Sequence, residues 1–387
     1  MARLGDICEI VSGTTPKSNV PEYWDGEINW VTPAELDDDS RIIYESQRKI
    51  TEQAVKDSSL KSFPSGTVLL SSRAPIGKVA IAGTEMYCNQ GFKNLICSEK
   101  IYNKYLFWFL KGKTEYLNSL GRGATFKEIS KGIVENIEIP LPLISEQKHI
   151  AELLDGVSNL ILLRQQQLAK LDELVKARFV EMFGDPVQKS NRSPHVPMTE
   201  LCEIIDGDRG TNYPKQEEFS EEGYCLFLNT KNVTAQGFSF DNCQYITAEK
   251  DALLHKGRLC RGDIVLTTRG TIGNLAFYND SVPFENMRIN SGMVILRIDR
   301  EILKEIFFIE QFKILLTLIK EQIASGSAQP QLPISAMYKI LILLPDIDKQ
   351  KIFSNFVEKI NRQSLTIQQS LDKLDVLKKA LMQEYFG

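Results

Sequence analysis

The second half of this chain repeats the first, most clearly in a long stretch that ends in Phe-Gly. Phe183-Gly184 recurs 203 positions later as Phe386-Gly387, and Gln147-Lys148 recurs at the same offset as Gln350-Lys351. Several Leu, Lys, Ala and Glu residues between these anchors also match. A duplication of this kind predicts two similar modules. Two similar modules can present similar surfaces to one partner of near-repeating geometry, such as duplex DNA.

Two kinds of segment alternate along the chain. Long stretches rich in strand and turn signals are each followed by a long amphipathic helix, and a proline-containing linker separates the two copies. We therefore expect an α+β fold, a tandem repeat of a mixed α/β domain followed by a long helix. The predicted segments are domain 1 at 1–145, helix 1 at 146–184, a linker at 185–198, domain 2 at 199–345 and helix 2 at 346–387.

The two long helices carry a heptad pattern, in which apolar residues recur with an average period of 3.5 residues. Each helix has one continuous apolar line, while Arg and Ser or Lys residues interrupt the companion line. Such a seam predicts an antiparallel coiled coil between the helices. The alternative is that each helix packs only on its own domain. The predicted pairing residues are Leu154, Ile161, Leu168 and Val175 in helix 1, and Ile360, Ile367, Leu374 and Leu381 in helix 2.

Bulk composition excludes several classes of protein. The 387 residues are 43% hydrophobic with a formal net charge of −4, so any DNA-binding surface must be a local patch. The seven cysteines form no Cys-x-x-Cys pair, which favours free thiols in a reducing compartment. The start of the chain lacks an apolar signal core, and no run reaches the length of a membrane span. We expect a cytoplasmic location and no membrane partner.

Motifs that would carry catalysis are incomplete. The segment from Ser72 to Lys78 resembles a phosphate-binding loop but has Ser in place of the first Gly. The three histidines, at 149, 195 and 255, lack ligand partners at a metal-binding spacing. The sequence therefore predicts no catalytic residues, no cofactor site and no metal site in this chain.

Polar residues on matching turns are suited to reading a duplex. Arg73 and Arg269 lie in hydroxyl-rich turns between two apolar strands, and arginine can bind a guanine edge or a phosphate bidentately. For each residue alone, a solvated turn is an equally good interpretation, whereas the duplicated set favours DNA contact. The candidate DNA-binding residues are Thr14, Thr15, Thr32, Ser71, Ser72, Arg73, Lys78, Asn89, Gln90, Arg122 and Lys127 in the first copy, and Thr211, Asn212, Asn229, Lys231, Thr267, Thr268, Arg269, Asn290, Ser327 and Gln329 in the second.

Short motifs, repeated in the same order, resemble those of one known family. The segment from Leu141 to Ala151, Leu-Pro-Leu-Ile-Ser-Glu-Gln-Lys-His-Ile-Ala, and its echo at 344–353 are similar to the start of the helices in type I restriction–modification specificity subunits. The Arg-x-x-Ile-Gly turns, at 73–77 and 269–273, and the Phe-Gly-Asp-Pro after helix 1 match the same family. Lys349 departs from it, because the family has Glu there. The resemblance covers the whole chain.

The resemblance implies a non-catalytic subunit that reads a split, asymmetric DNA site, one half with each domain, while the paired helices set the gap between the halves. It implies two methyltransferase subunits as partners, which would carry S-adenosylmethionine, and a nuclease or translocase subunit as an optional addition. Two alternatives remain open at this point. One is the specificity chain of a related phage-defence system, and the other is a scaffold that only bridges proteins.

Overall fold

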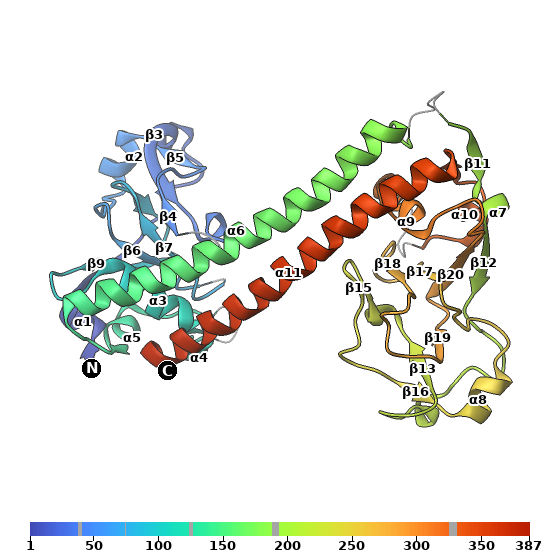
Figure 1. The fold of residues 1–387 in the computed structure, drawn as a ribbon. Helices are drawn as coiled ribbons and strands as arrows, with labels where there is room; N and C mark the ends of the chain where they lie inside the picture. Colours follow the sequence, from blue (N-terminus) through green and yellow to red (C-terminus); the bar gives the residue numbers. More distant parts are fainter. Residues whose placement is uncertain (38–40, 74, 124–126, 188–192, 325–330) are drawn as a thin grey trace. The chain divides into compact units, whose positions relative to one another are not determined.

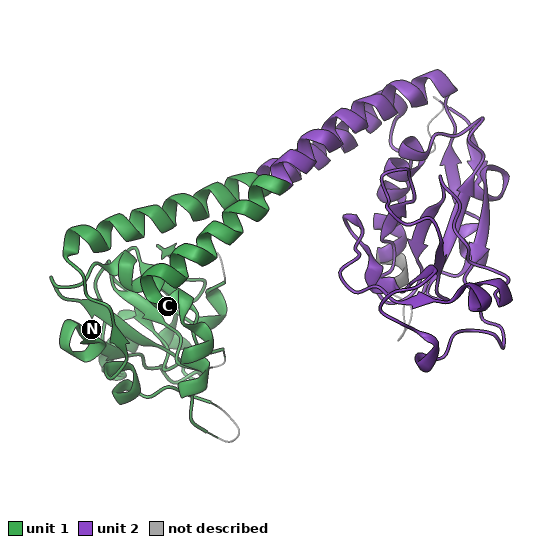
Figure 2. Cartoon of the chain, turned by 60° about the horizontal axis from the view of Figure 1, so that its bottom comes forward, with its two compact units in different colours: residues 1–165, 369–387 green, residues 166–368 purple. Residues whose placement is uncertain are grey.

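The chain forms two compact units, which are coloured separately in Figure 2. The structure is a computed structural model, and it describes all residues except 38–40, 74, 124–126, 188–192 and 325–330. Unit 1 comprises residues 1–165 and 369–387, and unit 2 comprises residues 166–368. Each unit therefore holds the first part of one long helix and the last part of the other.

Unit 1 is built on a five-stranded sheet in the order β2-β9-β6-β7-β4 (Figure 1). These strands are β2 (Cys8–Ser12), β9 (Lys93–Cys97), β6 (Val68–Leu70), β7 (Val79–Ala82) and β4 (Ile42–Ile43). A three-stranded sheet joins β5 (Lys49–Ile50), β3 (Trp24–Val31) and β8 (Tyr87–Cys88), and a short pair joins β1 (Ala2–Arg3) to β10 (Glu138–Ile139). The helices are α1 (Leu4–Ile7), α2 (Glu52–Asp57), α3 (Asn103–Gly112), α4 (Thr114–Leu120) and α5 (Lys131–Glu135).

Both faces of the five-stranded sheet are covered. Side chains alternate between the faces of a strand, so Val68 and Leu70 point into the core that contains α3, while Leu69 points into a second core with Val31 and Phe92. Burial on both faces explains why β6 and β7 are continuous apolar runs rather than alternating ones.

Unit 2 repeats this plan. Its four-stranded sheet has the order β12-β20-β17-β18, formed by β12 (Cys202–Asp206), β20 (Met293–Ile298), β17 (Ile264–Thr267) and β18 (Leu275–Phe277). A three-stranded sheet joins β16 (Tyr245–Ile246), β13 (Cys225–Leu228) and β19 (Met287–Ile289), and a hairpin joins β14 (Val233–Thr234) to β15 (Gly237–Phe238). The helices are α7 (Met198–Leu201), α8 (Ala248–Leu253), α9 (Glu305–Ala324) and α10 (Ile334–Met337). The fold is thus the α+β repeat that the sequence predicts.

One end of the predicted linker is structured. His195–Pro197 forms strand β11, which pairs antiparallel with β21 (Leu341–Leu343). Pro194 precedes this short strand and Pro197 ends it. Because proline is tolerated at strand ends and sheet edges, a strand of this kind is easily mistaken for a linker in the sequence. Residues 195–198 therefore belong to the second globular part, and 188–192 lie outside the described residues.

The long helices are α6 (Ile144–Phe183) and α11 (Ile347–Phe386). Each begins with a buried glutamine that ties it to its unit. The Gln147 side chain accepts from the Tyr102 backbone N–H (2.8 Å) and donates to the carbonyls of Lys100 (3.1 Å) and Pro142 (2.9 Å). Gln350 accepts from the Lys304 N–H (2.9 Å) and donates to the carbonyls of Ile302 (3.0 Å) and Pro345 (2.8 Å).

The predicted helix-pairing residues are the sheltered positions of both helices. Leu154, Val175, Ile360 and Ile367 are buried, and Ile161, Leu168, Leu374 and Leu381 are half-buried. The core of unit 1 includes Leu154 of α6 and Phe386 of α11, whereas the core of unit 2 includes Val175 and Phe179 of α6 with Val357 of α11. Both helices thus contribute to both cores.

Candidate nucleic-acid interface

In unit 1 the predicted contact turn joins β6 to β7. The Ser71 hydroxyl donates to the Pro75 carbonyl (2.7 Å) and accepts from the Lys78 backbone N–H (2.8 Å). Gly77 adopts a φ of +93°, which glycine tolerates, and its N–H donates to the Ser71 carbonyl (3.0 Å). The backbone N–H of Ser72, the residue after Ser71, donates to the Gly91 carbonyl (2.7 Å). The turn is therefore held from inside and from the neighbouring loop.

Unit 2 repeats these bonds atom for atom. The Thr267 hydroxyl donates to the Thr271 carbonyl and accepts from the Asn274 N–H (2.9 Å). Gly273 has a φ of +83°, and its N–H donates to the Thr267 carbonyl (2.8 Å). The Thr268 N–H donates to the Gly292 carbonyl (2.9 Å). The two turns share one hydrogen-bond plan although only a few of their residues are identical.

Four hydroxyl residues of the predicted contact set are corrected by this plan. Ser71, Ser72 and Thr267 are fully buried and Thr268 is 6% exposed, so their hydroxyls do not face a duplex. The Thr268 hydroxyl donates to the Gly292 carbonyl (3.0 Å), and the Ser72 hydroxyl accepts from the Lys93 ammonium (3.4 Å). Buried polar groups need partners, and these hydroxyls find theirs within the domain.

Asn89 and Asn290 also serve the framework. Each side-chain oxygen accepts a 2.9 Å bond from the backbone N–H two residues on, at Gly91 and Gly292. Each amide NH₂ keeps its donors, so the prediction that these residues contact adenine edges stays a prediction. Gly13 and Gly207 pack on these two loops. A Cβ at Gly13 would lie 1.9 Å from the Asn89 carbonyl oxygen, and one at Gly207 would lie 2.2 Å from the Asn290 carbonyl oxygen.

Thr32 and Asn229 both cap a short helical turn after a buried strand. In unit 1, Thr32 and Glu35 form a capping box, and in unit 2 Asn229 and Asn232 do the same. Lys78, predicted to contact DNA, instead donates to the carbonyls of Pro33 (3.2 Å) and Leu36. These bonds hold the capped turn in place. Thr32 and Lys78 therefore have structural roles, and the prediction that they also contact DNA stays a prediction.

The remaining candidates lie at least partly in solvent. Thr14, Thr15, Gln90, Arg122 and Lys127 are exposed in unit 1, and Thr211, Lys231 and Arg269 are exposed in unit 2, with Asn212 half-buried. Thr15 and Gln90 are hydrogen-bonded to each other, and the Asn212 amide donates to the Leu253 carbonyl (3.3 Å). Ser327 and Gln329 lie outside the described residues.

Charge differs between the two turns. Arg73 is half-buried, with its guanidinium 4.0 Å from the carboxylate of Glu128, and Glu128 also pairs with the buried Lys93 (3.2 Å). Arg269 is exposed, and the ion pairs found among the described residues do not include it. Binding of a phosphate or base by Arg73 would therefore require it to leave the Glu128 carboxylate, whereas Arg269 already faces solvent.

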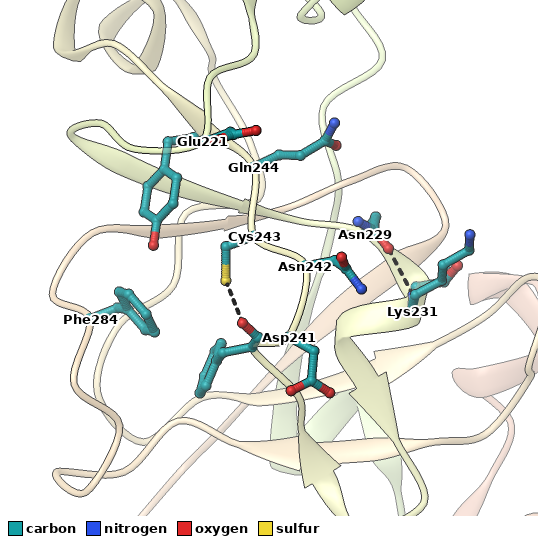
Figure 3. A pocket seen from close by; sticks show the side chains of 11 residues that line it. Glu221, Asn229, Lys231, Asp241, Asn242, Cys243, Gln244 and Phe284 are labelled. Atoms are coloured by element: carbon teal, nitrogen blue, oxygen red, sulfur yellow. Dashed lines mark hydrogen bonds between the residues drawn. The ribbon is translucent and has the colours of Figure 1, made fainter.

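A hollow of about 1070 Å³ lies beside the capped turn of unit 2 (Figure 3), and we refer to it as the Asn242 hollow. Two of its residues, Asn229 and Lys231, are among the contacts predicted from sequence, whereas Asn242 and Gln244 are not. The signal available in the sequence was a pair of amide residues, Asn242 and Gln244, in the short segment between Phe240 and Tyr245. The lining consists of Glu221, Asn229, Thr230, Lys231, Phe240, Asp241, Asn242, Cys243, Gln244, Tyr245 and Phe284.

No group of three or more His, Cys, Asp or Glu side chains with metal-binding geometry occurs among the described residues. The seven cysteines are free, and burial raises the pKa of the Cys88 and Cys202 thiols to about 12, which makes them poor nucleophiles. Within the described part of the chain, none of the helices is long and apolar enough to cross a membrane.

Comparison with known proteins identifies the relatives of the chain. The family model described as "Type I restriction modification DNA specificity domain" matches residues 1–173 and 195–376. The MjaIX specificity subunit of Methanocaldococcus jannaschii is 31% identical over 98% of this chain and 90% of its own length. The EcoprrI specificity subunit of Escherichia coli is 22% identical over 92% and 86%. The S subunit structure from M. genitalium shares the fold, with a TM-score of 0.59 at 18% identity over 100% and 95% of the chains.

Proposed function

The chain belongs to the type I restriction–modification DNA specificity family, and we propose that it reads a bipartite, asymmetric DNA site with one half-site for each domain. As a member of this family the chain recognises DNA sequence and is not itself a catalyst. The resemblance inferred from its repeated motifs is thereby confirmed.

One observation supports the asymmetric site most directly. The two domains share a hydrogen-bond framework, from the Ser71 and Thr267 turns to the capped turns at Thr32 and Asn229, yet the exposed side chains on that framework differ. Equivalent frames hold unlike side chains in the same place, so each domain would present its own donor and acceptor pattern to a groove. Two identical half-sites would instead favour identical exposed residues.

The long helices would set the distance between the half-sites as an antiparallel coiled coil. Support comes from the burial pattern, since the sheltered residues of α6 and α11 recur every three or four positions while most residues between them are exposed. Forty residues at 1.5 Å per residue make a helix of about 60 Å. That is ample to place two domains in major grooves about 34 Å apart on one face of a duplex.

The helices also offer surface for partner proteins. In unit 1, large apolar side chains on both helices stand in solvent, among them Leu160 (48% exposed), Leu163 (58%) and Val376 (68%). Apolar side chains that stand in solvent favour protein docking. We propose that two methyltransferase subunits bind these helices and bring S-adenosylmethionine with them, and that a nuclease subunit is an optional addition. The setting would be the cytoplasm.

Methylome sequencing of the host, with and without this gene, tests the proposal. We expect a bipartite methylated motif, with two unlike halves and a gap of constant length, that disappears on deletion and returns when the gene is restored. A methylome that does not change on deletion would overturn the proposed function. A motif with two identical halves would overturn the one-domain-per-half assignment.

A further inference from the structure

The Asn242 hollow contains two amide side chains that the fold does not use. Asn242 and Gln244 contribute their backbone carbonyls to the domain, accepting from the Asn232 side chain (3.1 Å) and the Phe227 N–H (2.8 Å). Among the described residues no hydrogen bond engages their side-chain amides. The backbone at these two positions is thus anchored, while a donor and an acceptor on each side chain stay available.

The platform beneath these amides is rigid. Asn232, which is 2% exposed, donates to the carbonyls of both Ser239 and Asn242, each at 3.1 Å. Phe240 packs against Phe284 with ring centroids 4.8 Å apart. A backbone that is fixed before a ligand arrives loses less entropy on binding, so this platform is suited to recognition.

The charges of the hollow exclude a simple phosphate site. Lys231 is accompanied by two carboxylates, Glu221 and Asp241, so the lining carries one positive and two negative groups. A phosphate site would need an excess of positive charge, whereas a surface that reads base edges needs amides and selected charges. The mixture therefore favours base edges over the sugar–phosphate backbone.

The hollow is continuous with the Arg269 turn. Thr230, which lines the hollow, packs on that turn, because a Cβ at Gly292 would lie 2.8 Å from its methyl carbon and one at Gly270 would lie 3.8 Å from its hydroxyl oxygen. The turn that carries the exposed Arg269, which is able to hold a phosphate or a guanine, therefore lies against the Thr230 side of the hollow.

Unit 1 has the same frame with other chemistry. In its capping box Glu35 occupies the place of Asn232, and its carboxylate accepts from the Thr32 N–H (2.7 Å) and the Gln47 N–H (2.6 Å). Ala34 stands where unit 2 has Lys231. The features that make the hollow a reading surface are thus particular to the second domain.

We propose that the Asn242 hollow is the base-reading surface of the second domain, that Asn242 and Gln244 are its specificity-determining residues, and that its ligand is a half-site containing adenine. Asn and Gln amides bind the N6 and N7 edge of adenine in the major groove bidentately. This inference rests on the proposed function, because it assumes that the second domain reads DNA.

The test replaces the chromosomal gene by Asn242→Ala or Gln244→Ala and sequences the host methylome. Each variant should lose base preference at one position of one half-site. At that position, the roughly 5- to 150-fold preference for adenine over the other bases should fall to about one-fold. The other half-site and the gap should not change. Gln236→Ala is the matched control, an exposed amide of the same domain outside this hollow, and it should leave the motif unchanged.

Asn242→Asp keeps the shape of the side chain and guards against a variant that fails to fold. Aspartate accepts from the cytosine amino group, so the same position should shift from adenine toward cytosine. Suppose that wild-type cells show a bipartite motif and that Asn242→Ala, Gln244→Ala and Asn242→Asp all leave it unchanged. That result would overturn the inference but leave the proposed function standing. If wild-type cells show no such motif, the proposed function fails first, and the inference fails with it.

Discussion

Replacing Gln147 or Gln350 by alanine should destabilise the start of each long helix and leave the other unit intact. Each glutamine is fully buried and makes three hydrogen bonds, one accepted and two donated, to backbone groups in two separate preceding segments. A buried backbone group left without a partner costs about 1–3 kcal/mol. Alanine leaves room for water to satisfy part of this loss, so we take the low end for each group and expect about 3 kcal/mol per site.

The assay is residue-resolved hydrogen exchange on the full chain, because a chain of two units does not unfold in a single two-state step. The Tyr102 amide N–H donates to Gln147, and the Lys304 N–H donates to Gln350. Gln147→Ala should therefore increase exchange at Tyr102 and leave Lys304 protected, and Gln350→Ala should do the reverse.

Two further variants sharpen this experiment. Gln147→Met fills the space but can neither donate nor accept these bonds, so it should destabilise at least as much as alanine, which admits water. Gln166→Ala changes an exposed glutamine of the same helix and should stay within about 0.5 kcal/mol of wild type. Suppose instead that Gln147→Ala lowers the stability by less than about 1 kcal/mol and leaves the Tyr102 amide protected from exchange. That result would refute the view that these glutamines fasten the helices to their units.

Three other predictions concern DNA binding, half-site spacing and pH. Arg73→Ala and Arg269→Ala should each weaken binding to one half-site by about 1–3 kcal/mol in a duplex-binding titration, and unchanged affinity in both would remove them as contacts. Inserting one heptad into both helices, after Gln165 and after Gln368, adds about 10 Å and should lengthen the methylated motif by roughly three base pairs; an unaltered gap would contradict the spacer role. Burial raises the pKa of Asp208, but three backbone N–H donors outweigh it and lower the pKa overall. Its stabilisation is therefore present above pH about 4 and is lost on further acidification. In thermal melts from pH 7 to pH 3, the Tm of Asp208→Asn should fall less than the Tm of the wild type. Equal decreases in Tm would exclude Asp208 as a source of the acid sensitivity.

The repeated motifs led to the family correctly, but they separated framework from contact poorly. Ser71 and Thr267 recur because they close the same turn in both copies, so their repetition reflects folding rather than DNA reading. Asn242 and Gln244 escaped notice for the opposite reason. A comparison of the two halves finds what they share, whereas side chains that distinguish two half-sites are those that differ.

The sequence by itself determined the duplication, the two long helices and the absence of the tested catalytic motifs, since each is a local or periodic property of neighbouring residues. Which polar groups meet solvent was decided only by the tertiary structure. Ser72 looks exposed in a turn of serines, yet the loop that carries Gly91, about twenty residues later, closes over it. Burial depends on which distant strands and loops pair, and the order of residues along the chain does not specify that pairing directly.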